Sequence, residues 1–427
     1  MGLEIFEHGE LPRWAKVRQH LDASTIRDVA GAVAIEFGRP EVREAIESGT
    51  RVALTAGSRG IDRIAEVLTA AVAEVKKLGG EPFAVPAMGS HGGATAEGQL
   101  ELLWHYGITE ASLGCPIRAS METVLLGELE EGVPVWFDKT AYEQADIVIP
   151  VGRVKPHTDF HGPVESGLMK MLAIGLGKQK GAEMFHRCGF PDFHRLIPAV
   201  GRFTLSRVNV PFGLALIENG YGTLSLIEAV PAAQIWDREQ ELLVIAREKM
   251  ATLPGEAYDL LVIDQIGKDI SGSGADPNVI NRDFTGLVAP GEAALKPTIQ
   301  RVIIRDLTHD TEGNATGFGL GDVVLRQAVE KMDPISSYMN VITAKSPQGV
   351  RIPLTVENDR QALQIGLACC IQIEPATAKI ARIRDTKHLE TLWVSEPLLP
   401  ELLTTGRVET MTESAPIAFD DEGMFID

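Results

Sequence analysis

Short apolar runs alternate with segments of helical periodicity from about residue 50 onward. Residues 51–55 form an apolar run that predicts a strand, followed by the loop AGSRG. Residues 61–78 carry apolar positions at helical spacing and are followed by two glycines, a typical helix end. A second strand is predicted at 82–86, and after the loop MGSHGG a helix capped by Thr95 runs over 95–106.

The next segments extend this rhythm and then change it. A predicted strand over 145–151 leads into a loop rich in His, Pro and Gly. Residues 213–230 contain two apolar runs around Asn-Gly-Tyr-Gly, which predicts a β-hairpin. An amphipathic helix over 233–251 ends at Pro254-Gly255, where we place a domain boundary.

The second half of the chain restarts the alternation. Strands are predicted at 258–264, 300–305 and 379–383, and helices at 321–332 and 360–370.

These elements predict an α/β protein of two domains with mainly parallel sheets, residues 1–255 and 256–427. In such sheets ligands bind beyond the C-terminal ends of strands. Arg59, His91 and His157 occupy such positions in the first domain and Gln265 in the second. We therefore expect an active-site cleft between the domains.

Composition narrows the function. Of 427 residues, 44% are hydrophobic and 23% charged, as in globular proteins. The net charge of -19, with no basic stretch, argues against nucleic acid as a partner. The N-terminal segment lacks the pattern of a signal peptide and no apolar run matches a membrane span, so we expect a cytoplasmic protein that does not bind membranes. Four cysteines without a CxxC pair indicate reduced, buried thiols: Cys115, Cys188, Cys369 and Cys370.

Histidines supply the candidate chemistry. Among ten histidines, His91, His157 and His186 each lie in or after a glycine-containing segment. His157 and His161 also have the H-x3-H spacing found in metal sites. A zinc or iron hydrolase that uses His157, His161 and His186 is therefore one hypothesis.

Five segments, in order along the chain, resemble motifs of the nickel-pincer lactate racemase family: TAGSRG, MGSHGG, VKPHTDFHGPVESGLMKM, GAEMFH and DQIGK. The resemblance spans residues 50–268. It implies a 2-hydroxy acid racemase or epimerase that uses a nickel-pincer nucleotide, the nickel complex of pyridinium-3,5-bisthiocarboxylic acid mononucleotide. Dedicated biosynthetic enzymes that make this cofactor are then the implied partners.

The same resemblance implies a role for each matching residue. His91 and His157 correspond to the two acid/base histidines, and His186 to the nickel ligand. Imidazole suits both tasks, because it titrates near neutral pH and binds nickel in its neutral form. Lys170 corresponds to the lysine near the cofactor, and the substrate carboxylate is expected to contact Arg59, Gln265 and Lys268. In addition, backbone amides at Ser166 and Gly167 are candidates to approach the cofactor phosphate.

The chain also departs from the family pattern. Ala56 stands where lactate racemase has an aspartate that orients a catalytic histidine, and Asp62 and Asp159 are candidates to replace it. Extra residues between His157 and Lys170 include His161 and Glu165. Because these changes surround the substrate, we expect a substrate other than lactate.

A third hypothesis is a non-catalytic protein that only holds a nucleotide or the cofactor. Two retained acid/base candidates argue against it, because a carrier needs only the ligand histidine.

Overall fold

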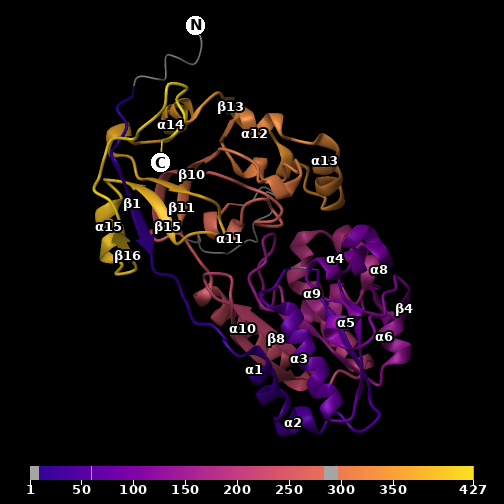
Figure 1. Cartoon of the computed structure of the whole chain (residues 1–427). Coiled ribbons are helices and arrows are strands. Elements are labelled where there is room, and N and C mark those ends of the chain that lie inside the picture. The colour runs from indigo at the N-terminus through magenta and orange to yellow at the C-terminus, as the bar shows by residue number, and fades with distance from the viewer. Residues whose placement is uncertain (1–8, 59, 283–296, 427) are drawn as a thin grey trace. The chain divides into compact units, whose positions relative to one another are not determined.

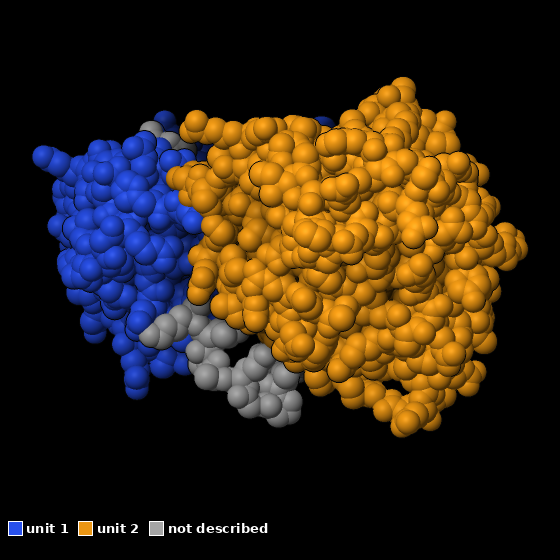
Figure 2. Space-filling model, turned by 90° about the horizontal axis from the view of Figure 1, so that it is seen from below, with its two compact units in different colours: residues 1–22, 251–427 blue, residues 23–250 orange. Residues whose placement is uncertain are grey.

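The protein is described by a computed structural model that covers residues 9–58, 60–282 and 297–426. It is an α/β protein with mostly parallel strands. Contacts divide the chain into two compact units: unit 2 is residues 23–250, and unit 1 combines residues 1–22 with 251–427. Figure 1 traces the chain and Figure 2 colours the units separately.

The strands of unit 2 run at the centre of its fold. Parallel strands follow the order β3-β2-β6, and the chain continues from β6 through Pro150 into β7, the first strand of the order β7-β8-β9. Strand β9 returns antiparallel to β8, as the hairpin signal predicts. The strands are β2 (Arg51–Ala56), β3 (Glu81–Pro86), β6 (Ile147–Ile149), β7 (Val151–Arg153), β8 (Phe212–Glu218) and β9 (Leu224–Pro231), with a separate hairpin of β4 (Thr123–Glu128) and β5 (Pro134–Asp138).

Helices cover both faces of these strands. On β2, Val52 and Leu54 join one buried cluster and Ala53 joins another, because successive strand residues point to opposite faces. The first cluster packs under α1, α3 and α4, and the second under α7 to α10. The helices of unit 2 are α1 (Val29–Phe37), α2 (Pro40–Arg43), α3 (Ile64–Lys77), α4 (Ala96–His105), α5 (Glu110–Leu113), α6 (Lys139–Gln144), α7 (Leu168–Lys170), α8 (Lys178–Cys188), α9 (Phe193–Arg207) and α10 (Ile235–Lys249).

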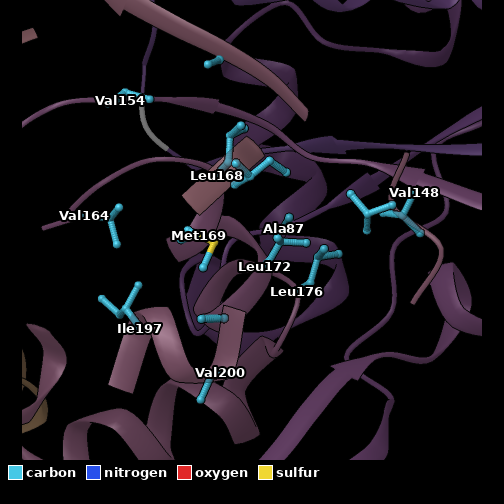
Figure 3. Close-up of a cluster of buried hydrophobic side chains, with 14 of the residues drawn as sticks. Ala87, Val148, Val154, Val164, Leu168, Met169, Leu172, Leu176, Ile197 and Val200 are labelled. Atoms are coloured by element: carbon cyan, nitrogen blue, oxygen red, sulfur yellow. The ribbon is translucent and has the colours of Figure 1, made fainter. Parts of the chain in front are cut away.

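The cluster that includes Ala53 anchors the segment that carries Lys170. Figure 3 shows Leu168, Met169 and Leu172 in one cluster of buried side chains with Ile197 and Val200 of α9. Between α7 and α8, residues Met171–Gly175 form a π-helical turn, a feature frequent at functional sites.

Unit 1 contains a mixed sheet of eight strands among its described residues. Its order is β13-β12-β11-β10-β14-β15-β1-β16, parallel from β13 to β14 and antiparallel beyond. The elements are β1 (Trp14–Gln19), β10 (Ala257–Ile263), β11 (Thr298–Ile304), β12 (Val323–Leu325), β13 (Leu354–Val356), β14 (Ile380–Ile383), β15 (Thr391–Ser395), β16 (Val408–Thr410), α11 (Pro277–Ile280), α12 (Arg326–Glu330), α13 (Pro334–Thr343), α14 (Asp359–Ala368) and α15 (Leu399–Thr404).

Two features of unit 1 differ from the sequence predictions. Residues 1–22 group with the C-terminal half rather than with the first predicted domain, because β1 pairs with β15 and β16. The helix predicted over 321–332 begins only at Arg326, since Val323–Leu325 is a buried strand between β11 and β13.

Two smaller findings complete the fold. All four cysteines are free thiols, but only Cys115 is buried and Cys188 is exposed, so the expectation of buried thiols is wrong for three of them. Within the described residues, no helix has the length and apolar character needed to cross a membrane.

Candidate active site

Three loops that follow parallel strands carry the candidate residues of unit 2. Ser58 follows β2, His91 follows β3, and His157 follows β7. Because these strands point the same way, their C-terminal loops lie at the edge where open α/β sheets bind ligands.

One helical segment, residues 166–186, packs against all three loops. A Cβ on Gly57 would lie 3.4 Å from Cε of Met171 in the π-helical turn. The amide of Gly89 donates to the carbonyl of Gly175 at 3.1 Å. Ser166 ends the third loop and passes directly into α7. The loops of Ser58, His91 and His157 are thus arranged around the segment that also carries Lys170 and His186.

His91 is held at its ring and at its backbone. Oγ of Ser58 is hydrogen-bonded to Nδ1 of His91. The side-chain amide of Gln99, which is buried, donates to the carbonyl of His91 at 3.2 Å and to that of Gly89 at 3.1 Å. Gly92 has a φ of +67°, and a Cβ there would lie 2.6 Å from the backbone of Gly98, so only glycine lets this loop reach α4.

His157 is held by the residues that follow it. The backbone N–H of Asp159 donates to Nδ1 of His157 at 3.0 Å, and Oδ2 of Asp159 lies 3.6 Å from the same nitrogen. Because Nδ1 accepts a hydrogen bond, the neutral imidazole carries its proton on Nε2. The side chain is 14% exposed, so the ring is largely removed from bulk water.

An aromatic cluster joins three of the predicted residues, and consists of Phe160, Phe190 and Phe193. The ring of His157 lies 4.4 Å from that of Phe160. The ring of His186 lies 6.0 Å from those of Phe190 and Phe193. Nζ of Lys170 lies 5.9 Å from the centre of the Phe160 ring. The structure therefore brings His157, Lys170 and His186 to one aromatic cluster.

Ser166 and Gly167 have structural partners. Ser166 exchanges backbone hydrogen bonds with Lys155. A Cβ on Gly167 would lie 2.4 Å from Oε1 of Glu239, and Oε2 of this buried carboxyl accepts the amide of Met169 at 2.9 Å. Burial raises the pKa of Glu239 to about 8. The Met169 amide at the start of α7 is thus used inside the protein, and a phosphate contact at Ser166 and Gly167 stays a prediction.

The residues predicted to bind the substrate do not belong to the aromatic cluster. Gln265 and Lys268 belong to unit 1, in the loop after β10. The backbone N–H of Gln265 donates to the carbonyl of Arg384 at 2.9 Å, and Nζ of Lys268 donates to the carbonyl of Gly272. Both side chains are partly exposed. Arg59 lies outside the described residues.

The hydrolase hypothesis has less support than the histidine spacing indicates. Nδ1 of His161 lies 3.3 Å from Oε1 of Glu165. Across the part of the chain that the structure describes, no three His, Cys, Asp or Glu side chains come together as a metal site. Among the described residues, therefore, no third protein ligand joins the two histidines of the H-x3-H spacing.

Asp62 and Asp159, the two carboxylates proposed to replace the one missing at Ala56, have different surroundings. Asp62 pairs with Arg63 at 3.2 Å and accepts the amide of Leu224 at 2.9 Å. Asp159 is the one beside a candidate histidine. Ser58 is not among the residues predicted from the sequence, although a hydroxyl in a strand-end loop that precedes a histidine loop is a usable signal.

The structure defines an α/β protein of two compact units. By sequence, the chain matches no protein-family model and no curated protein. By structure, it is similar to the lactate racemase apoprotein from Thermoanaerobacterium thermosaccharolyticum, with a TM-score of 0.52 and 15% identity. The match covers 90% of this chain and 95% of the other, and at this identity it establishes the fold alone.

Proposed function

We propose that the protein is a racemase or epimerase of a 2-hydroxy acid that uses a nickel-pincer nucleotide. The observation that carries the proposal is the meeting of His157, Lys170 and His186 at one aromatic cluster. Lys170 and His186 lie on the segment that also packs against the His91 loop. The lactate racemase-like fold supports it.

The residues fit the proposed cofactor by their chemistry. His186 would bind nickel through its imidazole, a donor that suits this metal. Lys170 would lie near the cofactor, and the aromatic cluster offers apolar surface beside both side chains. When bound, the cofactor supplies reversible acceptance of hydride from carbon 2 of the substrate.

The protein's own residues bind the substrate and move the hydroxyl proton. Arg59, Gln265 and Lys268 bind the carboxylate, because two cations and an amide suit a planar anion. To take the hydroxyl proton at Nε2, His157 must carry its own proton on Nδ1, directed towards Oδ2 of Asp159 at 3.6 Å instead of facing the Asp159 N–H. His91 serves the opposite stereoisomer in the same way, so that each enantiomer has its own acid/base group.

Activity measurements on single enantiomers test this proposal. The protein is produced together with the cofactor-biosynthesis enzymes, and chiral chromatography follows the opposite isomer of each 2-hydroxy acid. His91→Asn and His157→Asn should each lower kcat about 100-fold or more. Unchanged turnover in either variant contradicts the two-histidine mechanism, and retained cofactor with no turnover in the wild type favours a carrier. Lactate turned over faster than larger hydroxy acids contradicts the expected substrate.

A further inference from the structure

Glu165 is a buried carboxylate in contact with four polar groups. Its side chain has no exposed surface. Oε2 accepts the backbone N–H of His157 at 2.5 Å. Oε1 accepts the backbone N–H of Gly162 at 3.2 Å and Nη2 of Arg247 at 2.6 Å, and it lies 3.3 Å from Nδ1 of His161. Both oxygens are thus occupied by groups of the His157 loop and of α10.

The carboxylate is not needed to close the loop. Lys155 and Ser166 already bridge its two ends, with N–H···O distances of 3.1 and 3.2 Å in the two directions. Burying a carboxylate is costly unless a cation and hydrogen bonds compensate it. Arg247 and the backbone N–H groups provide this compensation at Glu165. What the carboxylate adds to the bridge is a fixed place for the backbone of His157.

The ring of His157 is then held from a second side. The N–H of Asp159 fixes Nδ1, and the ring of Phe160 lies 4.4 Å away. With its backbone bound to Glu165 and its ring bound within the loop, the imidazole has little freedom to turn. Such preorganisation matters for a residue that must meet a substrate oxygen within hydrogen-bond distance.

We propose that Glu165, paired with Arg247 of α10, is the positioning residue of His157. The inference rests on the proposed function only in taking His157 as an acid/base residue. A glutamine cannot replace Glu165, because its amide has one acceptor oxygen and turns an NH2 group towards an N–H donor. Glu165→Gln therefore releases the His157 backbone while it keeps the size of the side chain.

Hydrogen exchange in the cofactor-free protein tests the contact itself. In Glu165→Gln, the single amide oxygen stays with Arg247 and Gly162 and the NH2 group faces the backbone N–H of His157. The His157 amide should therefore exchange about tenfold faster or more, because it loses its acceptor. The bridged amides of Lys155 and Ser166 should stay within about twofold of wild type. Unchanged exchange at His157 overturns the proposal, and this readout does not depend on any activity.

A double-mutant cycle tests the action through His157. Glu165→Gln should lower kcat about 10- to 100-fold with KM within about threefold, but cost about twofold or less in the His157→Asn background. Equal losses in both backgrounds overturn the positioning role and leave a merely structural one. If Glu165→Gln does not fold, Arg247→Gln is tested instead. It should also speed exchange of the His157 amide and lower kcat only when His157 is present. Glu241→Gln removes an exposed Glu–Arg pair on the same helix and should change neither readout.

If the wild type lacks racemase activity, the proposed function fails while the exchange measurement still decides the position of His157.

Discussion

Oγ of Ser58 is hydrogen-bonded to Nδ1 of His91, and this contact joins the loops that follow β2 and β3. A hydroxyl both donates and accepts, so Ser58 can serve either neutral tautomer of His91. In this chain the hydroxyl stands two residues from Ala56. The family that the sequence motifs resemble has a carboxylate at the Ala56 position.

Ser58→Ala should therefore lower kcat about tenfold or more while KM changes little, because the imidazole loses the group that orients it. Ser58→Thr keeps the hydroxyl and should recover most of the activity. Ser206→Ala, which removes an exposed hydroxyl of α9, serves as the control. Equal activity of the alanine variant and the wild type contradicts a role for Ser58.

The carboxylate of Asp159 should contribute to activity independently of the hydrogen bond that its backbone N–H donates to His157. Asp159→Asn keeps the N–H that binds Nδ1 of His157 but removes the negative charge 3.6 Å from that nitrogen. We expect kcat to fall about tenfold or more in steady-state assays. Asp310 lies 3.3 Å from Nδ1 of His309 in a fully solvated pair, so Asp310→Asn is a matched control that should have no effect. A similar loss in both variants argues against a specific role.

Much of the fold was predictable because burial on both faces of a parallel strand produces a continuous apolar run. Strands β2, β3 and β10 were found in this way, and the structure confirms the cap at Thr95, whose side chain accepts the amide of Gly98 at 3.1 Å. Strand β12 was missed because its three residues run directly into the helix-forming sequence of α12.

The candidate site was predictable only where motifs carry it. Glu239 lies in the charged stretch of α10, which has the composition of a solvated surface, so nothing local signals its burial. The burial of Lys178 is also not evident from the sequence, because its partner, Asp138, is distant along the chain. Tertiary packing, rather than local pattern, determines both positions.

Glu239 should make stability depend on pH. Its pKa is raised to about 8 by burial, whereas in the unfolded chain it titrates near its usual value of about 4.3. Between these values the folded protein holds a proton that the unfolded chain has lost, so the free energy of unfolding falls as pH rises through about 8. Glu239→Gln lacks this proton, and its Tm should fall less between about pH 6 and about pH 9 than that of the wild type. Parallel Tm curves contradict the assignment.

The buried pair of Lys178 and Asp138 should contribute to the free energy of unfolding of the protein. Nζ of Lys178 lies 2.8 Å from Oδ2 of Asp138 and donates to the carbonyl of Pro86, the last residue of β3, at 2.5 Å. Both side chains are fully buried. Lys178→Met leaves a buried carboxylate without its cation, which should lower the free energy of unfolding by about 3–5 kcal/mol.

Denaturant unfolding measures this loss. Lys77→Met, at a lysine whose side chain is 69% exposed and pairs with Glu74, should change the free energy of unfolding by less than about 0.5 kcal/mol. If Lys178→Met also changes the free energy of unfolding by less than about 0.5 kcal/mol, the buried pair is dispensable.

The most direct test of the central claim is the nickel content of the intact protein. The wild type and His186→Ala are produced with the cofactor-biosynthesis enzymes, beside a lactate racemase control, and metal content and intact mass are measured. We predict about one nickel per wild-type chain, associated with the cofactor, and a sharp fall in His186→Ala, because its imidazole is the proposed metal donor. A wild-type protein without nickel, in a preparation where the control is loaded, contradicts the proposed cofactor.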